Sequence, residues 1–150
     1  MQDIASLLYK IKVVDEKITR IFEKQLGISL TRYQILNDLL EAAPCSQQFL
    51  QEKMEIDRAA IARHLKILEE SGYVTRYRKQ DNQREMVVLP SQKAIQDMQL
   101  DPPAHHLEIK AAMENILSNE EEGTLLTLLE KLLLGLDRLP IAAINTNKGG

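Results

Sequence analysis

Cationic side chains are concentrated in one short segment of this 150-residue chain. Residues 57–84 hold seven Lys or Arg and four Asp or Glu, which gives the segment a net charge of +3. Residues 1–56 and 85–150 have net charges of -1 and -5, so the overall charge of -3 conceals a basic centre. Clustered ammonium and guanidinium groups attract polyanions, so this distribution indicates an anionic ligand. The net negative charge of the whole chain is weaker evidence against such a ligand.

Small side chains stand beside the cations at the start of this segment. Ala59, Ala60 and Ala62 would let a helix backbone approach a large ligand closely, and their methyl groups can contact the methyl group of thymine. Arg63 follows them and can reach a guanine edge or a phosphate. The alternative interpretation is that alanine is simply the best helix former and that the Lys and Arg residues form a solvated face.

The pattern around these residues predicts a helix that opens at Asp57 as N-cap and runs to Glu70. Ser71 and Gly72 should end it, because Gly adopts the left-handed conformation of a helix exit without strain. At about 100° per residue, apolar residues fall on one side and small or cationic residues on the other. A helix of this kind can place its N-terminal residues against base edges in the major groove of DNA. The apolar side holds Ile61, Leu65 and Leu68, and the opposite side holds Ala59, Arg63, Lys66 and Glu70.

Two shorter helices are predicted before this one. Thr31 is expected to cap the first, which should end at Pro44, and Ser46 is expected to cap the second over residues 47–54. Apolar residues at helical spacing should form their buried faces. The expected buried residues are Ile35, Leu36, Leu39 and Leu40 in the first helix and Phe49, Leu50 and Met54 in the second.

After Gly72 the pattern changes from the helical period to alternation, at residues 74–78 and again at 85–89. The polar residues 79–83 between them predict a turn, so we expect a two-stranded hairpin. Arg76, Arg78 and Arg84 lie on or beside this turn, where a projecting wing can follow a DNA backbone or enter the minor groove. Three compact helices followed by such a hairpin predict a winged helix-turn-helix.

Longer apolar segments flank this region. Apolar residues at three- and four-residue steps predict a helix over residues 4–22 that ends near Gly27, and leucines recur throughout residues 125–139. The fold class is therefore mainly α with a small β-hairpin wing. We expect residues 1–27 and 93–145 to be dimerisation helices around a winged region at 28–92, with a flexible tail at 146–150. The first helix could equally pack within its own domain.

The central residues resemble the MarR family of transcriptional regulators. The resemblance spans about residues 28–92 and is strongest in DRAAIARHLKILEESGYVTR. It implies homodimers in which the N- and C-terminal helices of both chains intertwine, while each chain offers one winged helix to half of a palindromic site. The matching residues are Asp57, Arg58, Arg63, Leu68, Glu69, Gly72 and Arg76.

The sequence departs from the family pattern in three places, one of which is Pro90, where the family usually has the Thr that starts the next helix. Ala59, Ala60 and Ala62 stand where the family commonly has Ser or Thr, so the hydroxyl contacts that the resemblance implies are missing. In the wing, Gln83 stands at the position of the family's arginine, and Arg84 follows one place later.

Sensing sites have little support in the sequence. Cys45 lies between two predicted helices, whereas the oxidant-sensing branch of the family keeps its reactive cysteine in the N-terminal helix. His105 and His106 are adjacent, so on a helix they point about 100° apart and cannot chelate one ion together. The resemblance implies a possible small-molecule effector, which we expect in the cleft between the winged helix and the dimerisation helices.

No residue pattern in the sequence indicates catalysis. There is no Gly-rich phosphate loop, no metal-ligand spacing and no nucleophile beside a base, so we expect neither enzymatic activity nor a cofactor. No apolar run reaches the roughly 20 residues that cross a bilayer. The N-terminus also lacks the charged start and apolar block of a secretory signal, so a cytoplasmic location is expected.

The sequence therefore predicts a homodimeric repressor of transcription that binds a pseudo-palindromic DNA operator and is released by an effector. The alternative is a winged helix that binds an acidic protein partner. Arg63 and Lys66 are the predicted groove contacts. The remaining predicted DNA-binding residues are Thr31, Ser46, Gln47 and Arg58 for the phosphate backbone, Ala59, Ala60 and Ala62 for close approach, and Arg76, Arg78 and Arg84 for the wing.

Overall fold

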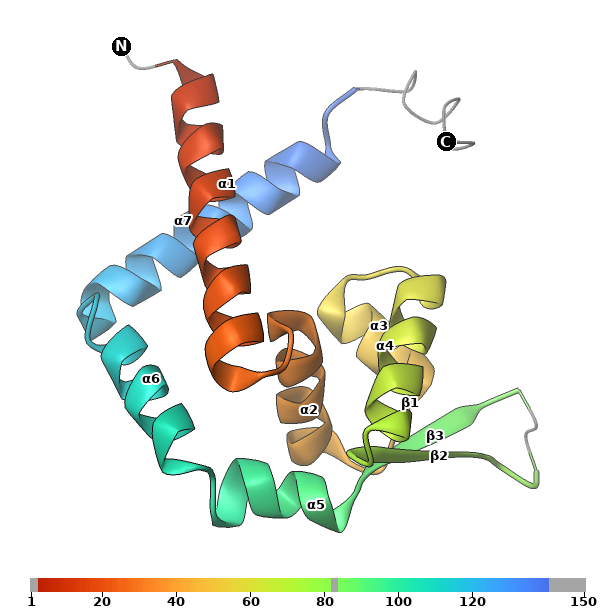
Figure 1. Ribbon diagram of the computed structural model, residues 1–150. Helices are drawn as coiled ribbons and strands as arrows, with labels where there is room; N and C mark the ends of the chain where they lie inside the picture. The colour runs from red at the N-terminus through yellow and green to blue at the C-terminus, as the bar shows by residue number, and fades with distance from the viewer. Residues whose placement is uncertain (1–2, 82–83, 141–150) are drawn as a thin grey trace. The chain divides into compact units, whose positions relative to one another are not determined.

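The computed structural model describes residues 3–81 and 84–140, which contain seven α-helices and three β-strands (Figure 1). The prediction of a mainly α fold with a small β element is confirmed. Two five-residue stretches of π-helix, Phe22–Leu26 and Gln96–Leu100, continue α1 and α5. The elements are α1 (Ile4–Ile21), α2 (Leu30–Ala42), β1 (Cys45–Ser46), α3 (Gln47–Met54), α4 (Arg58–Glu70), β2 (Val74–Arg78), β3 (Met86–Pro90), α5 (Gln92–Ile95), α6 (Ala104–Glu114) and α7 (Asn119–Asp137).

Helices α2, α3 and α4 pack around one apolar core with the sheet and α5. The inner side of α4 follows the prediction, because Ile61, Leu65 and Leu68 are at most 1% exposed. Burying each large aliphatic side chain contributes about 1.5–3 kcal/mol to the free energy of unfolding, so this core fixes the orientation of α4. The buried core residues are Ile35, Leu36, Leu39, Leu50, Ile61, Leu65, Leu68, Val74, Val88 and Ala94.

The sheet has three antiparallel strands in the order β1-β3-β2. Strands β2 and β3 form the predicted hairpin, with Arg78 opposite Met86, and the hairpin extends away from the helices (Figure 1). The prediction did not include a third strand, β1, which pairs with β3 through Cys45 opposite Val88. A two-residue strand is too short to show alternation in the sequence.

The N-caps of α3 and α4 are those predicted. Asp57 Oδ1 accepts a hydrogen bond from the Ala60 amide at 2.7 Å, and Ser46 Oγ accepts one from the Phe49 amide at 3.0 Å. Each bond satisfies an amide at the start of a helix that has no partner within the helix. Gly72 has φ 81° and provides the predicted left-handed exit after α4.

Two local predictions were wrong. The N-cap of α2 is Ser29, whose Oγ accepts from the Arg32 amide at 3.2 Å, so Thr31 lies inside the first turn rather than at the cap. Ser29 has the extended backbone of an N-cap, and the helix has already begun when the chain reaches Thr31. Phe49 is 40% exposed rather than buried, because α3 is short and directs Leu50 into the core.

Helices α1 and α7 have no buried residue within the described chain. Both carry large apolar side chains at the surface, such as Leu7 and Leu126, which are 51% and 58% exposed. The chain divides into two compact units between Leu107 and Glu108. The predicted tail at 146–150 lies outside the described residues. No helix within 3–81 or 84–140 is long and apolar enough to cross a membrane.

Candidate nucleic-acid interface

The outer side of α4 presents the predicted small and cationic side chains to solvent. Its exposed residues include Arg58, Ala59, Arg63 and Lys66, while Ala60 and Ala62 are half-buried. Neither Arg63 nor Lys66 forms a side-chain hydrogen bond or ion pair with any described residue. Two cations on one face that form no hydrogen bond or ion pair with a described residue are available to an anionic ligand.

The N-terminus of α3 presents hydrogen-bond donors. Ser46 Oγ accepts from the Phe49 amide, so its own O–H can still donate to a ligand oxygen. Gln47 is the first residue of α3 and is half-buried. The positive end of the helix dipole favours an anion at this point.

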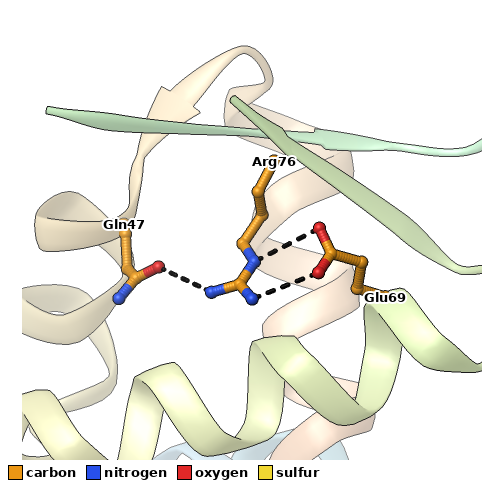
Figure 2. A network of polar contacts seen from close by, with 3 residues as sticks. All are labelled: Gln47, Glu69 and Arg76. Carbon is orange, nitrogen blue, oxygen red and sulfur yellow. Dashed lines mark hydrogen bonds and ion pairs between the residues drawn. The ribbon is translucent and has the colours of Figure 1, made fainter. Parts of the chain in front are cut away.

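Arg76 joins β2 to two helices (Figure 2). Its Nη2 lies 3.2 Å from Glu69 Oε1, and its Nε donates to Glu69 Oε2 at 3.5 Å. Its Nη1 donates to Gln47 Oε1 at 3.3 Å. The Arg76 side chain is only 16% exposed, so it differs from the exposed cations of α4 although the sequence grouped it with the DNA-binding residues.

The wing carries the remaining cations. Arg78 and Arg84 are exposed, and each has an interaction partner within the chain. Lys79 Nζ lies 3.4 Å from Glu85 Oε2, an ion pair across the base of the turn. Gln83, which stands at the family's arginine position, lies outside the described residues.

A histidine connects α4 to α2. Arg32 Nη1 lies 3.3 Å from His64 Nδ1. Because a guanidinium group only donates, Nδ1 must accept, and the ring proton of the neutral form is on Nε2. Partial burial, followed by the positive charges of Arg32 and Arg63, lowers the pKa of His64.

Comparison with known proteins agrees with this geometry. The MarR family model matches residues 28–86. The chain is 34% identical over 128 residues to an uncharacterised HTH-type transcriptional regulator, YdgJ, of Bacillus subtilis (strain 168). The aligned residues cover 85% of this chain and 77% of that protein. The chain belongs to the MarR family. Its predicted resemblance to transcriptional regulators of this family is thereby confirmed.

Solved structures share the MarR-type fold. A probable transcriptional regulator from Pseudomonas aeruginosa matches with a TM-score of 0.69 and 25% identity, over 83% of this chain and 94% of that chain. A MarR family transcriptional regulator from Streptomyces coelicolor, solved in complex with DNA, matches with a TM-score of 0.71 and 18% identity, over 88% of this chain and 84% of that chain. The winged helix-turn-helix architecture is therefore confirmed.

A second set of contacts in this MarR-family chain holds the end of α4 against α5. Ser91 Oγ donates to the Gly72 carbonyl at 2.6 Å, and Lys93 Nζ donates to the Ser71 carbonyl at 3.1 Å. Lys93 Nζ also lies 4.7 Å from the centre of the Tyr73 ring, and the Tyr73 hydroxyl donates to Asp97 Oδ2 at 3.4 Å. These bonds fix the exit of the recognition helix.

The residues considered for sensing lie in different local environments. Cys45 is half-buried in β1, where burial and the nearby Asp38 raise the pKa of its thiol and disfavour the reactive thiolate. His105 Nε2 lies 3.1 Å from Gln25 Oε1, and its ring is tilted 55° to that of His106. Within residues 3–81 and 84–140 there is no group of three or more metal-ligating side chains.

Two contacts near the candidate interface could not be predicted from the sequence. Arg32 contacts His64, which is 32 positions away, and Arg76 contacts Gln47, which is 29 positions away. Helical spacing relates only residues three or four positions apart, so it gives no sign of either contact. The pairing of Glu69 with Arg76 could have been suspected, because both residues belong to the matching family motif.

Proposed function

We propose that the protein is a homodimeric transcriptional repressor that binds a pseudo-palindromic DNA operator through α4 of each subunit. The observation that carries this proposal is the outer face of α4, where Arg63 and Lys66 are exposed and have no partner among the described residues. A face with small residues at its N-terminal end and cations behind them fits the major groove. The MarR family transcriptional regulator from Streptomyces coelicolor, which shares this fold, was solved in complex with DNA, and this supports DNA as the ligand.

Each set of residues would have a separate task on the duplex. Arg63 and Lys66 would contact base edges or groove phosphates, and the methyl groups of Ala59 and Ala62 would contact thymine. Phosphate contacts fix the register of a protein on DNA without reading its sequence. Those contacts would come from Thr31, Ser46, Gln47 and Arg58 in the helices and from Arg78 and Arg84 in the wing.

The dimer would be built from residues 1–27 and 93–145. Helices α1 and α7 expose apolar side chains along their length, and burying these against a second copy would remove them from water. Two α4 helices on the same side of such a dimer would lie about 34 Å apart, one turn of DNA. The protein would act in the cytoplasm by binding rather than catalysis, and a small-molecule effector would release it from DNA.

Selection from genomic DNA tests this function. Purified full-length protein is mixed with fragmented genomic DNA at a salt concentration that abolishes non-specific binding, and the retained fragments are sequenced. The expected result is enrichment of fragments that share a short inverted repeat. Enrichment of no sequence would contradict the proposal and would favour a module that binds an acidic protein partner.

A further inference from the structure

Arg76 occupies a point where three elements meet. It extends from β2, holds both carboxylate oxygens of Glu69 in α4, and donates to the side-chain amide of Gln47 at the start of α3 (Figure 2). Its side chain is 16% exposed, whereas Glu69 is 41% exposed. To reach a phosphate directly, Arg76 would have to give up these bonds.

We propose that Arg76 is a positioning residue for DNA binding rather than a phosphate contact. It neutralises the carboxylate of Glu69 beside the groove-facing side of α4, and it orients the amide of Gln47 so that its NH2 group faces a DNA phosphate. This inference rests on the proposed function, and it gives Arg76 a role in DNA binding that needs no direct contact with DNA.

The location of Glu69 gives the first part of this task its physical basis. Glu69 lies two helical turns after Ala62, about 20° from it around the helix axis, so both residues border the groove-facing side of α4. An uncompensated carboxylate at this position would repel the phosphates of a bound duplex. The paired contacts from Arg76 cancel that charge where the DNA would approach.

The chemistry of Gln47 gives the second part. A guanidinium group has only donors, so the oxygen of the Gln47 amide must face Arg76. The NH2 group consequently points away from Arg76, as Figure 2 shows. At the first position of α3, two outward N–H donors reinforce the positive end of the helix dipole and suit a phosphate oxygen.

A double-mutant cycle that removes each charge tests the effect of Arg76 on Glu69. Binding of a genomic fragment retained by the wild-type protein is measured by fluorescence anisotropy for R76Q, E69Q and the double variant, across a series of salt concentrations. R76Q should weaken binding about tenfold, and adding E69Q should restore it to within about threefold of the wild type, with the wild-type salt slope. Equal weakening in both backgrounds, with a slope lower by about one, would make Arg76 a direct phosphate contact and overturn the proposal.

A second cycle tests the orientation of Gln47. Gln47→Ala should weaken binding several-fold in the wild-type background and should have little further effect in R76Q, where the amide is no longer held. R76K should still neutralise Glu69, but it lacks the planar guanidinium group that reaches two partners at once. Its affinity for DNA should therefore lie between those of R76Q and the wild type. Additive effects of Gln47→Ala and R76Q would exclude the orienting role.

Control variants separate positioning from general loss of structure. Lys53 in α3 and Glu41 in α2 form an ion pair at 3.7 Å, outside both the proposed DNA contacts and the proposed dimerisation helices, and K53Q and E41Q remove the same kinds of charge. Both should bind DNA as the wild type does. Thermal unfolding of every variant is measured in parallel, and all binding is measured at a temperature at which the least stable variant is folded. If the wild-type protein retains no fragment, the proposed function fails. If the wild-type protein binds a fragment and the effects of the substitutions are additive in both cycles, only the proposed role of Arg76 fails.

Discussion

At the scale of single residues, two arginines with the same chemistry have different surroundings. Arg63 is exposed on α4 and has no side-chain partner among the described residues, whereas Arg76 is held by Glu69 and Gln47. The sequence predicted both as DNA contacts, because composition and spacing show where a cation lies along the chain but not what it touches. Exposure and pairing therefore determine which of them can meet a ligand directly.

Arg63→Ala should weaken binding of the specific operator by roughly 1–3 kcal/mol, because a base-reading arginine loses its contacts to guanine or phosphate. Competition titrations with specific and unrelated duplexes would measure the loss. Binding of unrelated duplexes should change less, so the ratio of the two affinities should fall. If the variant discriminates between the duplexes as well as the wild type does, Arg63 does not read bases.

His64 should make stability depend on pH. Partial burial and the charges of Arg32 and Arg63 lower its pKa, so the unfolded chain takes up this proton at a higher pH than the folded chain does. The free energy of unfolding should therefore fall as the pH drops below about 6.5, the ordinary value for histidine. Urea denaturation at pH 8 and pH 5.5 should show a smaller fall for H64Q than for the wild type. Equal falls would show that His64 does not contribute.

At the scale of elements, signals between neighbouring residues gave the bounds of α3 and α4. Asp57 and Ser46 were predicted as N-caps, and both accept the expected amide hydrogen bond. The cap of α2 was wrongly predicted at Thr31, because Ser29, two residues earlier, also carries a hydroxyl that can cap a helix. Strand β1 was missed because two residues cannot show a period. The contacts of Arg76 depend on the packing of distant elements, which no local pattern records.

Asp57→Ala should destabilise the protein by about 0.5–2 kcal/mol, because it leaves the Ala60 amide without its cap at the start of the recognition helix. Chemical denaturation would measure this change in the free energy of unfolding. Asp57→Asn keeps an oxygen that can accept the same bond and should recover most of the loss. If Asn is as destabilising as Ala, the cap hydrogen bond is not the source of stability.

At the scale of the whole molecule, the described chain has one well-packed core and three α-helices without a buried residue, α1, α6 and α7. Helices α2 to α4 and the sheet bury large aliphatic residues, while α1 and α7 expose theirs. The sequence anticipated this contrast from the density of leucines in residues 125–139. A second copy of the chain is the partner that we propose for these apolar surfaces.

Substitution of the α7 leucines should therefore change the oligomeric state. Leu126 and Leu133 are 58% and 54% exposed and lie seven residues apart on one side of the helix. Leu126→Glu combined with Leu133→Glu should convert a dimer to a monomer in sedimentation velocity, since each buried leucine contributes about 1.5–3 kcal/mol. The double variant should keep the circular dichroism spectrum of a folded protein, because the core of its winged region is unchanged. A wild-type monomer, or a variant that stays dimeric at the same concentration, would contradict the proposed dimer interface.

Hydroxyl-radical footprinting of a selected genomic duplex tests the central claim most directly. The purified full-length chain is added at a salt concentration that abolishes non-specific binding, and cleavage of both strands is read at single-nucleotide resolution. Two α4 helices held in one dimer predict two protected regions, related by two-fold symmetry and centred about 10 base pairs apart. No protection, or one unsymmetrical region, would contradict the account of a dimer that reads an inverted repeat through α4.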